Sequence, residues 1–121
     1  MTRWVAKPWG QEEIFAETPY YVGKILTIKA GHALSLQYHE RKTETMRVLS
    51  GEGELHLGTL PFTRVTQVIA LAPGSVCHLE PGTVHRLVAK SDLTVVEVST
   101  PHLDDVVRLE DRYGREGTRE P

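Results

Sequence analysis

The sequence contains one cysteine, Cys77, which excludes a framework of internal disulfides. Cys77 lies in the apolar run Val76–Leu79, where we expect an unreactive buried thiol in a reducing compartment. No apolar stretch approaches the roughly 20 residues that a membrane span needs. The N-terminal segment also lacks the apolar core of a signal peptide. We therefore expect a soluble, cytoplasmic protein with no membrane partner.

An excess of charge of one sign is absent as well. The 14 basic and 16 acidic side chains are interspersed and give a net charge of -2. This balance leaves no basic surface for nucleic acid. At 121 residues and 13.6 kDa, the chain is predicted to form one domain over residues 1–121. A domain of this size buries roughly two thirds of its unfolded surface, which is enough for a core without disulfide or metal staples.

Long segments with helical spacing are missing. The apolar pattern is short, rich in β-branched residues and interrupted by Gly and Pro turns. The predicted strands are Glu12–Ala16, Tyr20–Lys29, Leu34–His39, Thr45–Leu49, Gly53–Leu57, Arg64–Leu71, Ser75–Leu79, Val84–Lys90 and Leu93–Ser99. Many short strands separated by turns indicate an all-β antiparallel sandwich or barrel.

Residues 100–121 have a different composition, because 10 of the last 18 residues are charged. Val106, Leu109 and Tyr113 follow helical spacing, so the pattern predicts a short amphipathic helix over Asp104–Tyr113, ended by Gly114. We expect this segment to be a docked arm followed by a frayed tail.

The interval from Gly31 to Gly51 carries polar side chains at the spacing of a metal site built on strands. Gln37 and His39 are two residues apart and therefore share a strand face. Glu44 follows after a turn, and His85 comes from a distant strand. One amide oxygen, one carboxylate and two imidazoles suit a borderline divalent ion, with zinc preferred and manganese, iron or nickel as alternatives. The competing interpretation is a metal-free hydrogen-bonded cluster, which is costly to bury without a cation.

These residues also carry a resemblance to the cupin family. The first cupin motif is matched in every spacing by Gly31, Gln37-Tyr38-His39, Glu44 and Gly51, with Gln37 at the position of the first histidine. The second motif is matched by Gly74, Glu80-Pro81-Gly82 and His85, with Glu80 in place of a proline and Ala89 in place of an asparagine. The resemblance implies a cupin jelly-roll, the double-stranded β-helix barrel, with a short C-terminal arm.

More closely, the chain resembles the cupin domain of the type II mannose-6-phosphate isomerases that are often fused to mannose-1-phosphate guanylyltransferases. The shared segments are Pro8-Trp9-Gly10, Leu34 to His39, Gly82-Thr83-Val84-His85-Arg86 and Asp111-Arg112-Tyr113-Gly114-Arg115. The resemblance implies that Gln37, His39, Glu44 and His85 hold zinc. It also implies a metal-dependent aldose–ketose isomerase that acts on a sugar phosphate, mannose 6-phosphate being the family expectation.

The chain departs from the family at the predicted mouth of the barrel. Glu40, Arg41 and Lys42 replace the family's run of histidines and following arginine, and Thr45-Met46 replaces a His-Trp pair. These changes favour an alternative, a small stand-alone cupin that binds a sugar or metabolite without catalysis. An iron oxygenase is a third reading, less favoured because Gln37 replaces a histidine ligand.

Five further residues are candidates for chemistry at this site. Glu97, which interrupts an apolar strand, and His78 are candidate proton-transfer bases, with a structural histidine as the alternative for His78. Lys24, Arg41 and Arg86 are candidate phosphate contacts. Because Arg86 follows His85, a regular strand would turn it to the other face, which favours a structural role, whereas the family resemblance favours a functional one. The edge strands and apolar outer face expected of this fold predict a homodimer.

Overall fold

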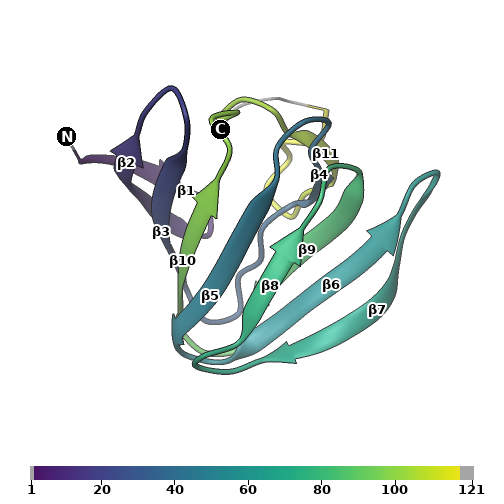
Figure 1. Ribbon diagram of the computed structural model, residues 1–121. Helices are drawn as coiled ribbons and strands as arrows, with labels where there is room; N and C mark the ends of the chain where they lie inside the picture. The colour runs from purple at the N-terminus through teal and green to yellow at the C-terminus, as the bar shows by residue number, and fades with distance from the viewer. Residues whose placement is uncertain (1, 118–121) are drawn as a thin grey trace.

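The structure is a computed structural model that describes residues 2–117, without the side chains of residues 62 and 63. Within these residues there are eleven strands and no helix (Figure 1). The strands are β1 (Arg3–Lys7), β2 (Gly10–Glu17), β3 (Val22–Ile28), β4 (Leu36–Tyr38), β5 (Glu44–Ser50), β6 (Gly53–Thr59), β7 (Phe62–Leu71), β8 (Val76–Leu79), β9 (Thr83–Ala89), β10 (Leu93–Ser99) and β11 (Val107–Glu110). No helix in this part of the chain is long and apolar enough to cross a membrane.

Two antiparallel sheets face each other (Figure 1). The first has six strands in the order β1-β2-β3-β10-β5-β8, and the second has five in the order β11-β4-β9-β6-β7. Strands that are neighbours in space are often distant in sequence, as β10 is from β3 and β9 from β4. The inner face of each sheet can therefore gather side chains from separate parts of the chain.

Period-two alternation fixes which side chains enter the interior. On β10, Leu93, Val95, Glu97 and Ser99 are buried, whereas Val98 is exposed. The apolar members of such sets form one core cluster of twelve buried residues that includes Trp9, Leu26, Leu55 and Leu87 among the described residues. Each large aliphatic side chain buried there stabilises the fold by about 2 kcal/mol. The core occupies one part of the interior, and polar side chains line the rest.

The nine predicted strands all correspond to strands of the structure, with ends shifted by a few residues. The predicted helix over Asp104–Tyr113 is wrong, because its central residues form β11. β11 pairs with β4 through Val107↔Tyr38 and Arg108↔Gln37. Backbone hydrogen bonds to the open edge of β4 outweigh a weak helical spacing. β1 was not predicted; it pairs with β2 in a hairpin whose exposed face carries Trp4.

Candidate metal centre

His39, Glu44 and His85 meet inside the barrel. His39 follows β4, His85 lies on the adjoining β9, and Glu44 opens β5 in the opposite sheet. The candidate ligand atoms of these three residues all lie within 4.8 Å of one another. Glu44 Oε1 is 3.4 Å from His39 Nε2 and 3.2 Å from His85 Nε2. All three side chains are buried, so bulk water does not stabilise their charges.

The outer nitrogen of each imidazole is held by a backbone carbonyl. His39 Nδ1 is hydrogen-bonded to the carbonyl of Asp105, and His85 Nδ1 lies 2.9 Å from the carbonyl of Thr83. A carbonyl only accepts hydrogen bonds, so each Nδ1 must donate. Neutral rings then present a lone pair on Nε2 toward Glu44 Oε1, and His39 Nε2 has no hydrogen-bond partner among the residues that the structure describes. Three acceptors this close require protons or a cation between them, and a metal ion fits this arrangement.

Gln37 lies beside this group but is turned to a different partner. Its Cα is paired with that of His85 in the sheet, and Gln37 and His39 line one cavity. The Oε1 atom accepts a hydrogen bond from Ser35 Oγ at 2.7 Å. The structure therefore brings together three of the four predicted ligands, and Gln37 as a fourth ligand stays a prediction. Two imidazoles and a carboxylate could hold a divalent ion such as zinc, manganese, iron or nickel.

Lys42 supplies a buried positive charge next to Glu44. Its Nζ lies 3.0 Å from Glu44 Oε2 and 3.1 Å from Glu97 Oε2. Burial alone would lower the pKa of Lys42, but Glu97 and Glu44 outweigh it and raise the pKa. Burial would likewise raise the pKa of Glu44, but the charge of Lys42 and the neighbouring imidazoles of His39 and His85 hold it well below its ordinary value. Glu44 is therefore ionised, as a metal ligand must be.

The side chain of Lys42 is buried although the residue lies in a turn, and Asp105 explains this position. The Asp105 carboxylate accepts hydrogen bonds from the backbone N–H groups of Glu40, Arg41 and Lys42 at 3.0, 2.7 and 2.9 Å. These bonds fold the turn so that the Lys42 side chain enters the barrel, while Arg41 faces solvent. The same residue, Asp105, thus fixes the His39 ring and the turn that follows it.

Glu97 is the predicted base that the structure brings to the centre. It is buried, lines the cavity and contacts Lys42. Burial raises its pKa, the nearby charge of Glu44 raises it further, and Lys42 and Lys24 only partly offset these effects. A carboxyl with a raised pKa can both accept and return a proton near neutral pH.

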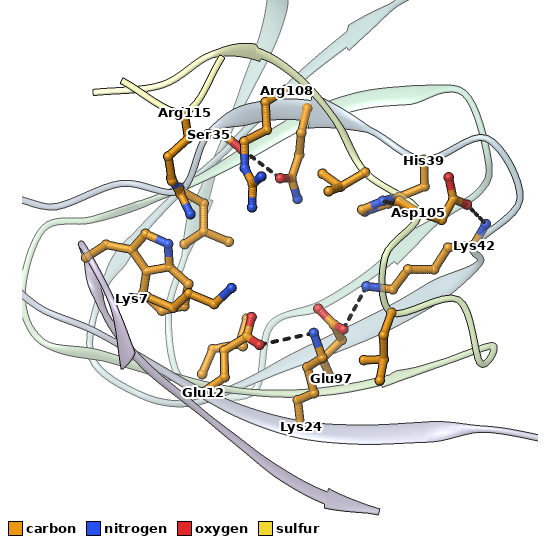
Figure 2. A pocket seen from close by; sticks show the side chains of 16 residues that line it. Lys7, Glu12, Lys24, Ser35, His39, Lys42, Glu97, Asp105, Arg108 and Arg115 are labelled. Carbon is orange, nitrogen blue, oxygen red and sulfur yellow. Dashed lines mark hydrogen bonds and ion pairs between the residues drawn. The ribbon is translucent and has the colours of Figure 1, made fainter. Parts of the chain in front are cut away.

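The cavity extends away from the metal ligands (Figure 2). His39 and Lys42 lie at one end, and Lys7 and Arg115 lie at the other, with Lys24 and Arg108 on opposite walls. Lys24 is buried and paired with Glu12, their Nζ and Oε1 atoms being 3.2 Å apart. Its placement in the cavity is compatible with the predicted contact to substrate.

His78, Arg41 and Arg86 are not brought to this cavity. His78 lies on β8 with its side chain 54% exposed, and it contacts Glu80 and Thr45, so we no longer consider it as a base. Arg86 Nε donates to the Leu34 carbonyl at 2.9 Å, because the residue after His85 faces the opposite side of β9. This geometry favours the structural role for Arg86.

The sequence reasoning missed Lys7, Glu12, Arg108 and Arg115 as cavity residues. Glu12 could have been found, because it shares strand parity with the apolar Ile14. Arg108 could not, because its position depends on β11.

Comparison with known proteins agrees with this architecture. A family model described as mannose-6-phosphate isomerase C-terminal matches residues 1–111. The xanthan biosynthesis protein XanB of Xanthomonas campestris pv. campestris is 34% identical over 118 residues, which cover 93% of this chain and 24% of XanB. Mannose-1-phosphate guanylyltransferase ManC of Salmonella typhimurium is 35% identical over 120 residues, covering 95% of this chain and 24% of ManC. The chain thus spans about a quarter of the length of the curated relatives it matches.

Solved structures show the same fold at low sequence identity. The capsular polysaccharide assembling protein CapF from Staphylococcus aureus superposes with a TM-score of 0.77 at 18% identity, over 91% of this chain and 34% of CapF. Oxalate decarboxylase of Bacillus subtilis, whose Mn(II) centres have been characterised, gives a TM-score of 0.72 at 15% identity, over 87% of this chain and 29% of that chain. With its two facing sheets and its matched family model, the chain has a cupin fold and belongs to the mannose-6-phosphate isomerase C-terminal family.

Proposed function

We propose that this domain is a metal-dependent sugar-phosphate aldose–ketose isomerase that interconverts mannose 6-phosphate and fructose 6-phosphate. The observation that carries the proposal is the placement of Glu97 in the same cavity as His39 and beside Lys42, which contacts Glu44. Membership of the family supports the substrate, as does similarity to a protein named mannose-1-phosphate guanylyltransferase.

His39, Glu44 and His85 would hold the ion, and Gln37 would join them if its amide turned away from Ser35. Zinc is the metal we propose, with manganese, iron and nickel as alternatives. A bound divalent ion would act as a Lewis acid that polarises the sugar carbonyl and the neighbouring hydroxyl.

Glu97 would carry the proton. Its carboxylate would take the proton from the carbon that bears the hydroxyl and return it to the former carbonyl carbon, while the hydroxyl proton passes to the former carbonyl oxygen, so that the aldose becomes the ketose through an enediol. Lys42 holds this carboxylate in place at 3.1 Å. The raised pKa of Glu97 makes the carboxylate a stronger base than an exposed glutamate.

The test is to incubate the zinc-loaded protein with mannose 6-phosphate and to measure fructose 6-phosphate. We expect turnover in the unaltered protein, and loss of both metal and turnover in His39→Ala. Stoichiometric zinc with no turnover would contradict the isomerase proposal, and stoichiometric zinc in His39→Ala would contradict the ligand assignment.

One observation favours the alternative of a binding module without catalysis. The ammonium of Lys42 lies between Glu44 and Glu97 and offsets their charge, so this part of the cluster is stabilised without a metal ion. Saturable binding of mannose 6-phosphate with no product would select this alternative.

A further inference from the structure

The outer face of the six-stranded sheet, the face turned away from the cavity, carries large apolar side chains. Glu12, Lys24 and Glu97 line the cavity, so the residues next to them on β2, β3 and β10 point outward. By the same alternation, five exposed apolar side chains lie on this outer face: Trp4, Phe15, Leu49, Val76 and Val98. Trp4 and Val76 are 62% and 61% exposed. Apolar side chains gathered on one sheet face are typical of an interaction surface.

Strand register aligns six residues of this outer face in one row across the sheet (Figure 1). The successive Cα pairs run through Trp4, Glu13, Ile25, Val96, Arg47 and Val76. The row is apolar at both ends and at its centre, and it carries one negative and one positive charge between them. Its centre falls between β3 and β10, which are the two middle strands of the sheet.

The two charges of the row lie symmetrically about this centre. Glu13 is one strand beyond Ile25, and Arg47 is one strand beyond Val96 on the other side. Three strand spacings separate Glu13 from Arg47, which is roughly 14 Å between their Cα atoms. This distance is too long for the two side chains to pair readily with each other within one copy of the chain.

A row of this kind is complementary to itself. A second copy, rotated by half a turn about an axis that runs along the strands between β3 and β10, presents the same row in reverse order. Glu13 then faces Arg47 of the second copy, and Trp4 faces Val76 of the second copy. A two-fold axis repeats every contact, so the charge pair forms twice. Two sheets stacked in this way match the aligned packing of β-sandwiches.

We propose that the outer face of the six-stranded sheet binds a second copy of this chain, with the two-fold axis between β3 and β10 and Glu13 opposite Arg47 of the other copy. The charges of the row favour a second copy over another protein, because the row meets its own reverse with opposite charges facing each other. The cavity lies on the inner side of this sheet, so the pairing covers neither the metal ligands nor Glu97. The inference therefore does not depend on the proposed function.

The experiment reverses the two charges singly and together. Sedimentation equilibrium measures the dissociation constant of the dimer for the unaltered chain, Arg47→Glu, Glu13→Arg and the variant that carries both changes. Each single change places like charges opposite each other twice, so the dimer should weaken about tenfold. The double variant exchanges the two charges and should recover the affinity of the unaltered chain. The control Arg64→Glu makes the same change at an exposed residue of β7 in the other sheet and should leave the affinity unchanged.

A second measurement locates the interface through tryptophan. The chain has two tryptophans, of which Trp9 is buried and Trp4 is exposed, so acrylamide quenching reports on Trp4. Trp4 should become shielded from acrylamide as the concentration of the unaltered chain rises, and Arg47→Glu should need about tenfold more protein for the same shielding. Arg47 is exposed and Glu13 is half-buried, so both changes should permit folding, and thermal melting checks this.

Four results would overturn the proposal. A chain that is monomeric over the whole concentration range would leave this face to a different partner or to solvent. Single variants that dimerise as tightly as the unaltered chain, or a double variant that fails to recover affinity, would exclude the contact between Glu13 and Arg47. A dimer in which Trp4 stays as accessible to acrylamide as in the monomer would place the interface elsewhere.

Discussion

The two ends of the cavity differ in how their charged side chains are paired and in how deeply they are buried. At the metal ligands, Glu44 and Glu97 share the ammonium of Lys42, and backbone carbonyls fix both imidazoles. At the opposite end, Lys24 pairs with Glu12 and Arg115 with Asp111, and Lys7 and Arg115 are only partly buried. A dry cluster favours a small ion held in one geometry, whereas a partly exposed end leaves its side chains in contact with water.

The largest expected effect comes from a substitution that removes the proposed base, Glu97, and leaves the three metal ligands unchanged. Glu97→Gln keeps the size of the side chain but cannot accept a proton. We expect kcat to fall about a thousandfold, with zinc content unchanged as measured by elemental analysis. A Glu97→Gln enzyme with near-normal kcat would exclude Glu97 as the base.

Lys42→Met tests the charge balance of the metal end. It leaves the buried carboxylates of Glu44 and Glu97 facing each other without a cation, so the metal-free protein should lose about 3 kcal/mol of stability to denaturant. Added zinc should recover part of this loss, because it restores positive charge. Lys90→Met, at an exposed pair with Glu54, is the control and should leave the unfolding midpoint unchanged. If Lys42→Met were as stable as the unaltered protein and its stability did not change with zinc, both the charge balance of this cluster and the metal site would be contradicted.

Asp105→Ala tests the turn that positions Lys42 without changing a metal ligand. Three backbone N–H groups of residues 40–42 lose their acceptor, which should cost about 2 kcal/mol and loosen the turn that carries Lys42. The neighbouring Asp104→Ala removes an exposed carboxylate and should have no comparable effect. Equal unfolding free energies for the two variants would show that the turn is held by other contacts.

The smallest expected effect is a loss of folding stability at low pH through Asp105. Burial would raise the pKa of Asp105, but the N–H groups of Glu40, Arg41 and Lys42 lower it below its ordinary value of 3.8. A group with a lowered pKa stabilises the fold fully above the unfolded pKa and loses this effect as pH falls through the folded pKa. Stability contributed by Asp105 should therefore be constant above about pH 5 and decline below 3.8. Asp105→Asn should show a shallower decline in acid-unfolding curves, and an identical curve would contradict the assignment.

Local sequence was enough to predict the residues whose direction depends on strand parity. His39, Glu44 and His85 were identified by spacing and family resemblance, and Glu97 by its place among Val95 and Val98 on a regular strand. Lys42 could not be placed, because its direction depends on Asp105, 63 residues away in the chain. Arg108 could not be placed, because β11 exists only through its pairing with β4. The zinc ion, the fourth ligand Gln37 and the homodimer stay predictions.

Asp105 joins the C-terminal segment to the metal ligands through the ring of His39. The His39 ring is held in place only when the segment around Asp105 is packed against it. An ion that binds His39 in this orientation must therefore stabilise the packed segment by the same free energy. Zinc should therefore protect the peptide bonds around residues 100–106 from a protease, and clipping there should release the ion. Protease cleavage around residues 100–106 would then indicate whether zinc is bound in the barrel.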